Sequence, residues 1–448
     1  LRCFLLLVGL FSLTGCGGDD STPYEPYTCY VGVYARDDGQ LLDIGSLSSA
    51  ALRWRLLDGR TGRISPDANA IWSGSFGWTD EPAPAEITFD ACPSQTLTVA
   101  GLPGDEGVYR RQTLLVTDST FRSDGLALAG RLVLPPGNKP VPIVVLVHGS
   151  ERSSALDYYP LQRLLPALGT GVFVYDKRGT GASAGEYTQD FDLLAGDAVA
   201  ALGEARRLAE DRAGRVGYQG GSQGGWIAPL AATRSDAAFV IASYGMLESP
   251  LLEDAMQAQQ DISALGYDQA VLAKVRELTD ATGRILASNF EEGGEELAAL
   301  KERYGNEPWY SEVRGEITGH MLSSPLWAFR FVYKNFVGVG TTWGHDPMAV
   351  IRAVEVPVLW VLAADDREAP PAGTQRALLE LQAERRDIAA AVFPRTDHGI
   401  LEYVETDTGR EMTRYADGYF RLLADWILDP RLQGPYGNAV LSPPRASE

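Results

Sequence analysis

The stretch RVGYQGGSQGGWIAPLAA, residues 215–232, decides how this sequence is organised. It contains the pattern G-x-S-x-G, in which Gly220 and Gly224 lie two positions on either side of Ser222. The residues before the pattern are typical of a buried strand, and those after it favour a helix. A sharp turn between the strand and the helix exposes the serine hydroxyl. It leaves almost no room for side chains two positions before and two positions after the serine, so glycine is needed at both. The pattern therefore predicts Ser222 as a nucleophile at the end of a strand.

Short apolar runs alternate with helical patterns on both sides of this stretch. Near-continuous runs of Val, Ile and Leu are typical of strands buried on both faces, and alternation with helices requires right-handed crossovers between parallel strands. We therefore expect an α/β core, a mostly parallel sheet with helices on both faces, built from residues 111–245 and 341–430. The expected strands are Ile143–Val147, Val172–Tyr175, Val216–Gln219, Phe239–Ser243, Val356–Leu362 and Ile388–Phe393, and the expected helices include Phe191–Leu208, Ala372–Glu384 and Glu411–Ile427.

Two further modules and a tail complete the expected organisation. Residues 29–110 consist of short β-prone pieces separated by turns, which predict a small all-β module, sandwich or ribbon-like. Residues 246–340 carry long helical patterns and predict a helical cap over the sheet. Residues 431–448 predict a loose tail. The tryptophans of the β module form either its core, which is the commoner use, or a carbohydrate or peptide surface: Trp54, Trp72 and Trp78.

The first residues have the pattern of a lipoprotein signal peptide, expected over 1–15. The uncharged run at 4–13 is too short to span a bilayer but suits a secretion signal. It leads into Leu-Thr-Gly-Cys, which resembles a bacterial lipobox, so Cys16 is the expected lipidation site. Residues 16–28 then form a tether. We expect the protein on the bacterial cell envelope, held by this lipid alone at the outer membrane, on its periplasmic side or surface.

Cysteine usage and charge exclude several classes of partner. In an exported protein Cys29 and Cys92 most simply form a disulfide, and two buried free thiols are the alternative. The four His and four Cys have no metal-ligand spacing, and we expect neither a metal nor an organic cofactor. Asp and Glu number 59 against 39 Lys and Arg, a net charge of −20. Such a surface repels phosphate backbones, so no nucleic-acid partner is expected.

A serine nucleophile requires a base and an acid that orients the base. His398 lies in PRTDHG, directly after the last expected core strand, and we predict it as the base in preference to His320 and His345. The loop after the strand VPVLWVLA supplies the acid. We predict Asp366, which precedes Pro by four positions at the start of a helix, and Asp365 is the alternative.

The tetrahedral intermediate needs two N–H donors for its oxyanion. The residue after the nucleophile, Gln223, supplies one. The loop His148-Gly149-Ser150 follows a buried strand, and we predict the Ser150 N–H as the second donor. His148 is expected to have a structural role in this loop.

From about Phe121 to the last helix, the sequence resembles an α/β-hydrolase of the bacterial alkyl-ester hydrolase and serine aminopeptidase-like group. The resemblance implies the α/β-hydrolase fold and the Ser-His-Asp triad, and it implies that Asp176 and Arg178 brace loops. The chain departs from the family pattern at Glu151, at Ala363 and at Gly221, where the family more often has Gly, Gly and His. The segments that carry the resemblance are SDGLALAGRLVLPPG, PIVVLVHGS, VFVYDKRGTGASAGEY, GYQGGSQGGWIAPLAA, VPVLWVLAADDREAPP and PRTDHGI.

These residues together predict an enzyme that cleaves small-molecule carboxylic esters through an acyl-enzyme intermediate. Members of this family type mostly cleave esters, and an alkoxide leaves more easily than an amine. One alternative is an exopeptidase of the serine aminopeptidase type, which would need carboxylates in the cap to bind an ammonium group. Another is a non-catalytic binding lipoprotein of the envelope, in which the β module binds the ligand. The cap carboxylates considered are Glu291, Glu292, Glu295 and Glu296.

Overall fold

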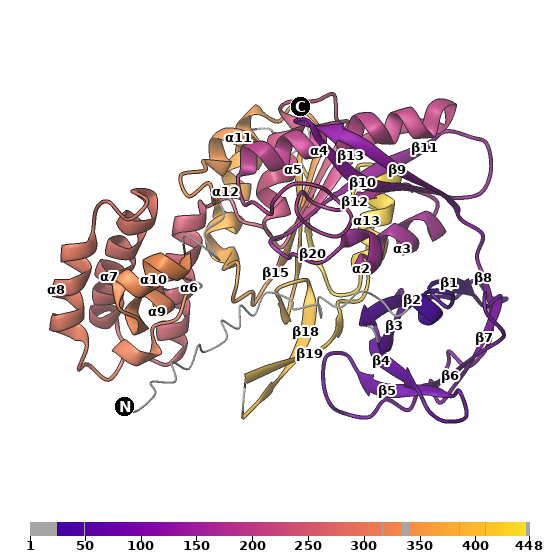
Figure 1. Cartoon of the computed structure of the whole chain (residues 1–448), viewed down its shortest axis with the longest axis horizontal. Coiled ribbons are helices and arrows are strands. Elements are labelled where there is room, and N and C mark those ends of the chain that lie inside the picture. Colours follow the sequence, from indigo (N-terminus) through magenta and orange to yellow (C-terminus); the bar gives the residue numbers. More distant parts are fainter. Residues whose placement is uncertain are drawn as a thin grey trace, which may run out of the picture.

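The computed structural model describes residues 25–48, 50–315, 317–333, 340–384, 386–407 and 409–444. The expected signal peptide, the lipidation site Cys16 and most of the expected tether lie outside these residues. Figure 1 shows a β module at the lower right, a large α/β core above it and a helical module at the left.

The N-terminal module is a closed antiparallel barrel, in which each strand pairs with the next and β1 pairs with β8. An all-β module is confirmed, but it closes into a barrel and is neither sandwich nor ribbon. Trp54 and Trp72 are buried in its interior, as alternating side chains of small barrels must be. The predicted Cys29–Cys92 disulfide is present. The strands are β1 (Gly32–Ala35), β2 (Leu41–Ser48), β3 (Ala51–Leu56), β4 (Thr61–Pro66), β5 (Trp72–Phe76), β6 (Glu86–Phe89), β7 (Thr96–Ala100) and β8 (Gly107–Arg111).

The core contains a nine-stranded sheet in the order β20-β16-β15-β14-β13-β11-β12-β10-β9. The strands from β16 to β12 in this order pair in parallel, and the outer strands β20, β10 and β9 are antiparallel. Parallel strands end at one edge, so the loops after β11, β13, β15 and β16 meet there. The bounds are β9 (Leu115–Ser123), β10 (Leu126–Leu134), β11 (Val141–Val147), β12 (Gly171–Tyr175), β13 (Ala213–Gly221), β14 (Val240–Ser243), β15 (Val358–Ala363), β16 (Ile388–Phe393) and β20 (Val440–Ser442).

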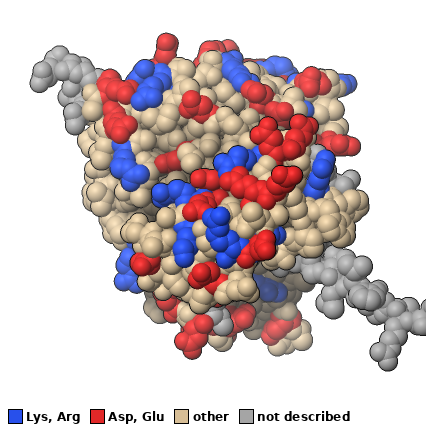
Figure 2. Space-filling view, turned by 90° about the vertical axis from the view of Figure 1, so that its left-hand side faces the viewer, with Lys and Arg blue, Asp and Glu red and all other residues tan. Residues whose placement is uncertain are grey.

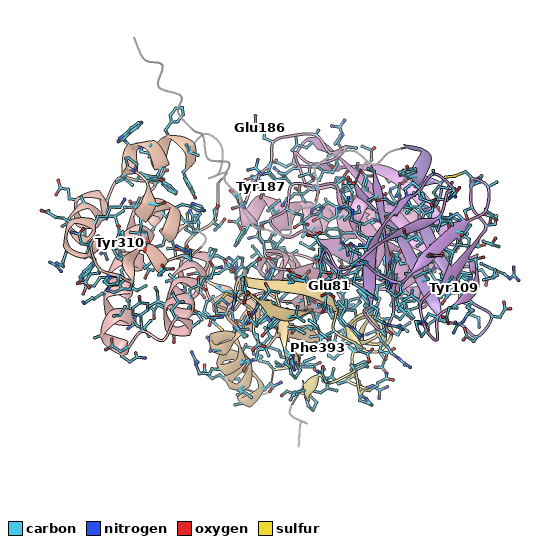
Figure 3. The ribbon with its side chains drawn as sticks, turned by 90° about the horizontal axis from the view of Figure 1, so that it is seen from below. Glu81, Tyr109, Glu186, Tyr187, Tyr310 and Phe393 are labelled. Atoms are coloured by element: carbon cyan, nitrogen blue, oxygen red, sulfur yellow. A yellow bond between two sulfur atoms is a disulfide. The ribbon has the colours of Figure 1, made fainter. Side chains whose placement is uncertain are left out.

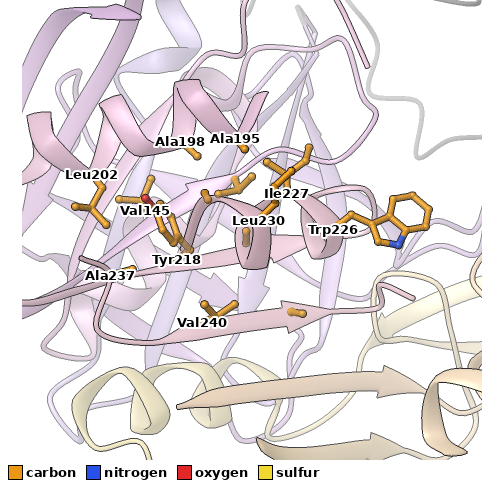
Figure 4. Packing of buried hydrophobic residues seen from close by; sticks show 14 of the residues in the cluster. Val145, Ala195, Ala198, Leu202, Tyr218, Trp226, Ile227, Leu230, Ala237 and Val240 are labelled. Atoms are coloured by element: carbon orange, nitrogen blue, oxygen red, sulfur yellow. The ribbon is translucent and has the colours of Figure 1, made fainter. Parts of the chain in front are cut away.

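Helices cover both faces of this sheet, as the sequence predicts. One apolar cluster lies under α4, α5, α11 and α12, where Trp226, Ile227 and Leu230 of α5 pack against the sheet (Figure 4). A second cluster lies on the opposite face under α2, α3 and α13. Besides α1 (Glu25–Thr28) and η1 (Glu210–Arg212), the helices are α2 (Ala155–Tyr158), α3 (Leu161–Ala167), α4 (Phe191–Ala209), α5 (Gly224–Ala232), α11 (Pro347–Ala353), α12 (Pro371–Ala383) and α13 (Tyr419–Leu428).

The helical cap is inserted between β14 and β15 and has an apolar core of its own. On the face shown in Figure 2, acidic and basic side chains are interspersed. None of the helices within the described residues is long and apolar enough to cross a membrane. The cap helices are α6 (Pro250–Ala264), α7 (Gln269–Ala287), α8 (Gly294–Tyr304), η2 (Tyr310–Glu312), α9 (Thr318–Ser323) and α10 (Leu326–Val332).

Two predictions near the C-terminus are wrong. Residues 411–415, expected to begin the last helix, belong to β19 (Gly409–Tyr415), which pairs with β18 (Leu401–Thr406); β17 (Thr396–Asp397) completes this small sheet. The helix starts only after Gly418, whose φ of 84° interrupts a helical path. The expected loose tail is also more ordered, because β20 pairs with β16.

The hairpin β18–β19 docks on two turns of the barrel. Tyr415 N donates to Gly59 O at 3.0 Å, and Trp78 N donates to Met412 O at 2.9 Å. A Cβ on Gly59 would lie 2.1 Å from Tyr415 O, and one on Gly77 would lie 2.3 Å from a carbonyl oxygen of β19. These glycines therefore permit backbone contact between the barrel and the hairpin.

A buried ion pair joins the barrel to the core at a second point. Asp43 of β2 is fully buried and accepts hydrogen bonds from Arg163 of α3, with Nε 2.6 Å from Oδ1. Arg55 of β3 donates to the same carboxylate at 3.0 Å. Loss of one partner from a buried ion pair leaves an uncompensated charge and strongly destabilises the folded protein. Arrangements of the barrel that separate Asp43 from Arg163 are therefore unfavourable, and the pair fixes how the barrel sits on the core.

Candidate active site

Ser222 lies at the turn from β13 to α5 and has a φ of 54°. A serine in this left-handed region is strained and is held there by its surroundings. Ser222 N donates to Ser243 O at 3.0 Å. A Cβ on Gly220 would lie 2.0 Å from Gly224 O, and one on Gly224 would lie 2.7 Å from Val147 O. The two glycines of the motif are therefore sterically required.

Tyr244 fills the space beside Gly221, one of the positions where the chain departs from the pattern of the family it resembles. A Cβ on Gly221 would lie 2.3 Å from the Tyr244 hydroxyl oxygen. Tyr244 itself has a φ of 42°, so its backbone is also strained. Its ring centroid lies 5.0 Å from that of His398. Tyr244 thus contacts both the turn that carries the serine and the ring of the predicted base.

The structure brings His398 and Asp366 together. His398 Nδ1 lies 3.0 Å from Asp366 Oδ2 and 3.1 Å from Oδ1, and both side chains are buried. Asp366 is held in turn by the backbone N–H groups of Glu368 and Ala369, at 2.9 and 2.8 Å. The alternative acid, Asp365, instead accepts a hydrogen bond from the hydroxyl of Tyr403, on the β18–β19 hairpin.

The other nitrogen of His398 faces a second carboxylate. His398 Nε2 lies 3.5 Å from Glu368 Oε2. Ser222 Oγ makes no hydrogen bond with any described residue, so it is not joined directly to the ring. Burial by itself would lower the pKa of His398, but the charges of Asp366 and Glu368 outweigh it and raise this pKa. Burial and the neighbouring carboxylates raise the pKa of Glu368.

The loop that follows β11 lies against the turn of Ser222. A Cβ on Gly149 would lie 3.5 Å from Ser222 Cβ. The N–H groups of Ser150 and Gln223 have no hydrogen-bond acceptor among the described residues. An oxyanion hole needs two such unpaired N–H donors, and the assignment of Ser150 and Gln223 to it stays a prediction.

The other histidines have structural surroundings. His148 Nε2 lies 2.5 Å from Tyr175 O. His345 packs edge-on against Phe191 and His320 belongs to α9 of the cap. Burial lowers the pKa of His345. Within the described residues, no group of three His, Cys, Asp or Glu side chains is arranged to hold a metal ion.

Asp176 and Arg178 brace loops, as the resemblance implies. Asp176 accepts from the hydroxyl of Ser154 at 2.8 Å, and Arg178 makes two hydrogen bonds of 2.7 Å to Asp197. The four cap carboxylates considered for ammonium binding are all exposed on α8 or just before it, and one of them, Glu296, pairs with Arg284.

Sequence reasoning missed Arg410, which ties the acid loop to the base loop. Its Nη1 donates to Asp397 Oδ2 and to Asp365 O, both at 2.7 Å. Asp397 Oδ1 accepts from the N–H groups of His398 at 2.8 Å and Arg367 at 2.9 Å. Asp365 and Asp397 each precede a member of the predicted triad. The repeated Asp before both residues was the only sequence signal for this clamp.

Residues 138–296 match the family model described as serine aminopeptidase, S33. The match covers about a third of the chain, and the nine-stranded sheet with helices on both faces has the α/β-hydrolase fold. The fold class and the hydrolase assignment predicted from the sequence are thereby confirmed. No curated protein matches this sequence.

Several solved structures are similar to this chain at low identity. An esterase of Pyrococcus furiosus is 14% identical over 64% of this chain and 83% of its own, with a TM-score of 0.41. An acylaminoacyl peptidase of Pyrococcus horikoshii is 16% identical over 90% of this chain and 64% of its own, with a TM-score of 0.43. Est1E of Butyrivibrio proteoclasticus, solved with ferulic acid, is 16% identical over 69% of this chain and 96% of its own, with a TM-score of 0.39.

Proposed function

We propose that the protein hydrolyses small carboxylic esters, with Ser222, His398 and Asp366 as its catalytic triad. The observation that supports this most is the hydrogen bond between Asp366 and His398 Nδ1. It joins two loops at the sheet edge where Ser222 occupies a strained turn. An acid bound to Nδ1 leaves Nε2 to act as the base.

In the proposed first step, Ser222 Oγ attacks the ester carbonyl carbon and His398 Nε2 takes the hydroxyl proton. Asp366 stabilises the imidazolium, and the N–H groups of Ser150 and Gln223 bind the oxyanion. The bond to the alkoxide then breaks, and the alkoxide leaves with the proton from His398. His398 Nε2 lies 3.5 Å from Glu368 Oε2, so this step requires Nε2 to come within hydrogen-bond distance of Ser222 Oγ instead.

In the second step, water attacks the acyl-enzyme. His398 Nε2 takes a proton from the water, and the same two N–H groups bind the second oxyanion. Collapse of this intermediate breaks the bond to Ser222 Oγ, which recovers its proton from His398. The products are an acid and an alcohol, and the residues of this chain supply every proton transfer.

Ser222→Ala tests the proposal directly. We expect hydrolysis of p-nitrophenyl acetate to fall by about 10⁴-fold or more, because the nucleophile is lost, and fluorophosphonate labelling to disappear. Ser73→Ala, at an exposed serine of the barrel, is the matched control and should retain both ester hydrolysis and fluorophosphonate labelling. Retained activity in Ser222→Ala, or a label on another serine, contradicts the proposal. A wild-type protein that neither hydrolyses nor labels favours the binding-lipoprotein alternative.

Cleavage of an N-terminal amino acid is a second candidate function, and Glu368 favours it. Its carboxylate lies beside the ring of His398, and the charge of Glu253 on α6 also acts on that ring. Two carboxylates at this point suit a substrate ammonium group. Comparing aminoacyl p-nitroanilides with p-nitrophenyl esters separates the two functions: a peptidase prefers the anilides and loses them selectively in Glu368→Gln.

We also propose that Cys16 carries the lipid that holds the protein to the bacterial cell envelope, at the outer membrane. The apolar run at 4–13 followed by Leu-Thr-Gly-Cys supports this. In cells grown with labelled palmitate, the full-length protein should take up label and fractionate with membranes. Cys16→Ser should do neither, and a labelled Cys16→Ser protein would contradict the proposal.

A further inference from the structure

Lys177 follows β12 and has its ammonium group buried beside the oxyanion loop. The residue is 1% exposed. Its Nζ donates to Gly149 O at 2.7 Å and lies 4.6 Å from the ring centroid of Tyr187, on the loop between β12 and α4 (Figure 3). Burying an ammonium group is costly unless it is paired. A lysine that merely filled space would be replaced here by an apolar residue at lower cost, so the position of the charge calls for an explanation.

The carbonyl that Lys177 binds belongs to the same peptide group as the predicted oxyanion donor. The only cis peptide bonds among the described residues precede Pro93 and Pro435, so the Gly149–Ser150 peptide is trans. In a trans peptide the C=O and N–H point in opposite directions. With the carbonyl held by Lys177, the Ser150 N–H points away from the ammonium, and it has no acceptor among the described residues.

We propose that Lys177 is a positioning residue of the oxyanion hole, whose ammonium orients and polarises the Gly149–Ser150 peptide and so strengthens the Ser150 N–H as a donor. Hydrogen bonds in a chain polarise one another, and a charged donor at the carbonyl increases the positive charge on the N–H. The inference rests on the proposed function, because it requires an oxyanion that forms at Ser222.

Glu151, where this chain departs from the family pattern, explains why a positive charge is needed. A Cβ on Gly149 would lie 2.5 Å from Glu151 Oε2, and Glu151 also bonds the hydroxyl of Tyr159. Burial alone would raise the pKa of Glu151, but His148 and Lys177 lower it to about 2. An ionised carboxylate at this point opposes the developing oxyanion, and the Lys177 charge offsets it.

The charged groups around Lys177 predict how the effect depends on pH. Burial lowers the pKa of Lys177 to about 8; Glu151 opposes this shift and Arg152, which stacks on the ring of Tyr187, adds to it. The flanking Asp176 and Arg178 are bonded elsewhere, to the start of α2 and to α4. The ammonium is therefore present below about pH 8 and is lost as the pH rises through it, so kcat should fall along this alkaline limb.

Two variants that leave Lys177 itself unchanged should move the alkaline limb of the kcat–pH profile in opposite directions. Arg152→Gln removes a repelling charge from an exposed residue, raises the pKa of Lys177 and should move the limb to higher pH with kcat at pH 7 unchanged. Glu151→Gln removes an attracting charge and should move the limb to lower pH. A limb that stays in place in both variants overturns the proposal.

Lys177→Met tests the proposal at its centre, with p-nitrophenyl acetate as substrate. We expect kcat at pH 7 to fall by about 10- to 100-fold, with KM within about twofold, because the weakened donor acts on the transition state. Binding of a trifluoromethyl ketone, which forms a tetrahedral oxyanion on the serine, should weaken in parallel. Lys177→Arg keeps a charge at every pH tested, so it should restore part of kcat and lack the limb near pH 8.

The outcomes separate this inference from the proposed function. If the wild type hydrolyses esters and folded Lys177→Met matches its kcat, or changes only KM, Lys177 has no role in the oxyanion hole. If the wild type hydrolyses neither esters nor anilides, the proposed function itself is wrong. If Lys177→Met does not fold, as judged by circular dichroism, the shifts in Arg152→Gln and Glu151→Gln decide the question.

Discussion

The barrel and the cap are both connected to the loops of Asp366 and His398, the barrel indirectly through the β18–β19 hairpin and the cap directly. The barrel binds the β18–β19 hairpin through main-chain hydrogen bonds at Gly59 and Trp78. The cap reaches the acid loop through side-chain amides of α6: Gln260 Nε2 donates to Asp366 O at 3.1 Å, and Gln257 donates to Glu368 O. Packed backbones have few alternative arrangements, whereas long amide side chains have many rotamers.

This difference assigns different roles to the two modules. The hairpin held by the barrel carries Arg410. Arg410 donates to Asp365 and Asp397, the residues that directly precede Asp366 and His398. The buried Asp43–Arg163 pair anchors the same barrel to the core. We therefore expect the barrel to set the geometry of the base, and hence kcat, and the cap to affect substrate fit, and hence KM. Under the proposed mechanism, a module without a catalytic residue of its own thus belongs to the catalytic framework.

Of the variants that test this difference between barrel and cap, Arg410→Ala should lower kcat the most. Without the guanidinium, the loops of Asp366 and His398 lose their shared partner, and a displacement of about 1 Å at a catalytic group costs about 10² in rate. We expect kcat for p-nitrophenyl acetate to fall by about that factor with little change in KM. Arg410→Lys should recover only part of the lost kcat, because a single ammonium group cannot reproduce the several N–H donors of the guanidinium group. A normal kcat in Arg410→Ala would remove the link between hairpin and site.

Gly59→Ala tests the barrel contact itself. Its new Cβ would overlap the backbone of β19, so we expect kcat to fall by about tenfold and the free energy of unfolding to drop by about 1–3 kcal/mol beyond the cost of backbone strain. Gly39→Ala measures that strain: its φ of 88° is close to the 96° of Gly59, but nothing lies within 4 Å of its Cβ position. Equal kcat values in the two variants would mean that barrel docking does not reach the site.

Glu368→Gln tests the carboxylate that lies where acid loop and cap meet. The negative charge favours the imidazolium of His398 and raises its pKa; removing it lowers this pKa, so the base is free at lower pH. The acidic limb of kcat/KM should move to lower pH by about one unit. The partly exposed Glu253 on α6 offers a more distant charge, and Glu253→Gln should move the limb less. A limb that moves to higher pH would contradict the assignment of the base.

Gln260→Ala should have the smallest effect. It removes one neutral hydrogen bond from the cap to the acid loop, which is expected to change KM by about two- to fivefold and kcat hardly at all. The measurement is a series of p-nitrophenyl esters of increasing acyl length, compared with wild type. If kcat falls as far as in Gly59→Ala, the cap and the barrel do not differ in role.

Much of the core and the candidate site follows from local sequence signals. Gly220 and Gly224 are required by short backbone distances within one strand–turn–helix unit, so five residues suffice to recognise the turn of Ser222. Chain order and strand ends bring His398 and Asp366 to the same edge, because parallel strands end together. The helix expected from Glu411 failed because β18 and the barrel provide pairing partners that a local pattern does not contain.

The sequence by itself determined the fold class, the glycine-flanked serine, the acid and base loops and the disulfide pair, since each depends on neighbours along the chain or on a simple count. Only the tertiary structure decided that Tyr244 fills the space at Gly221, that Glu368 faces His398, that Lys177 binds the carbonyl oxygen of Gly149 and that the barrel holds the hairpin of Arg410. These contacts join residues from separate elements. Their energies depend on distance and burial in the folded chain, and no periodicity in the sequence encodes either.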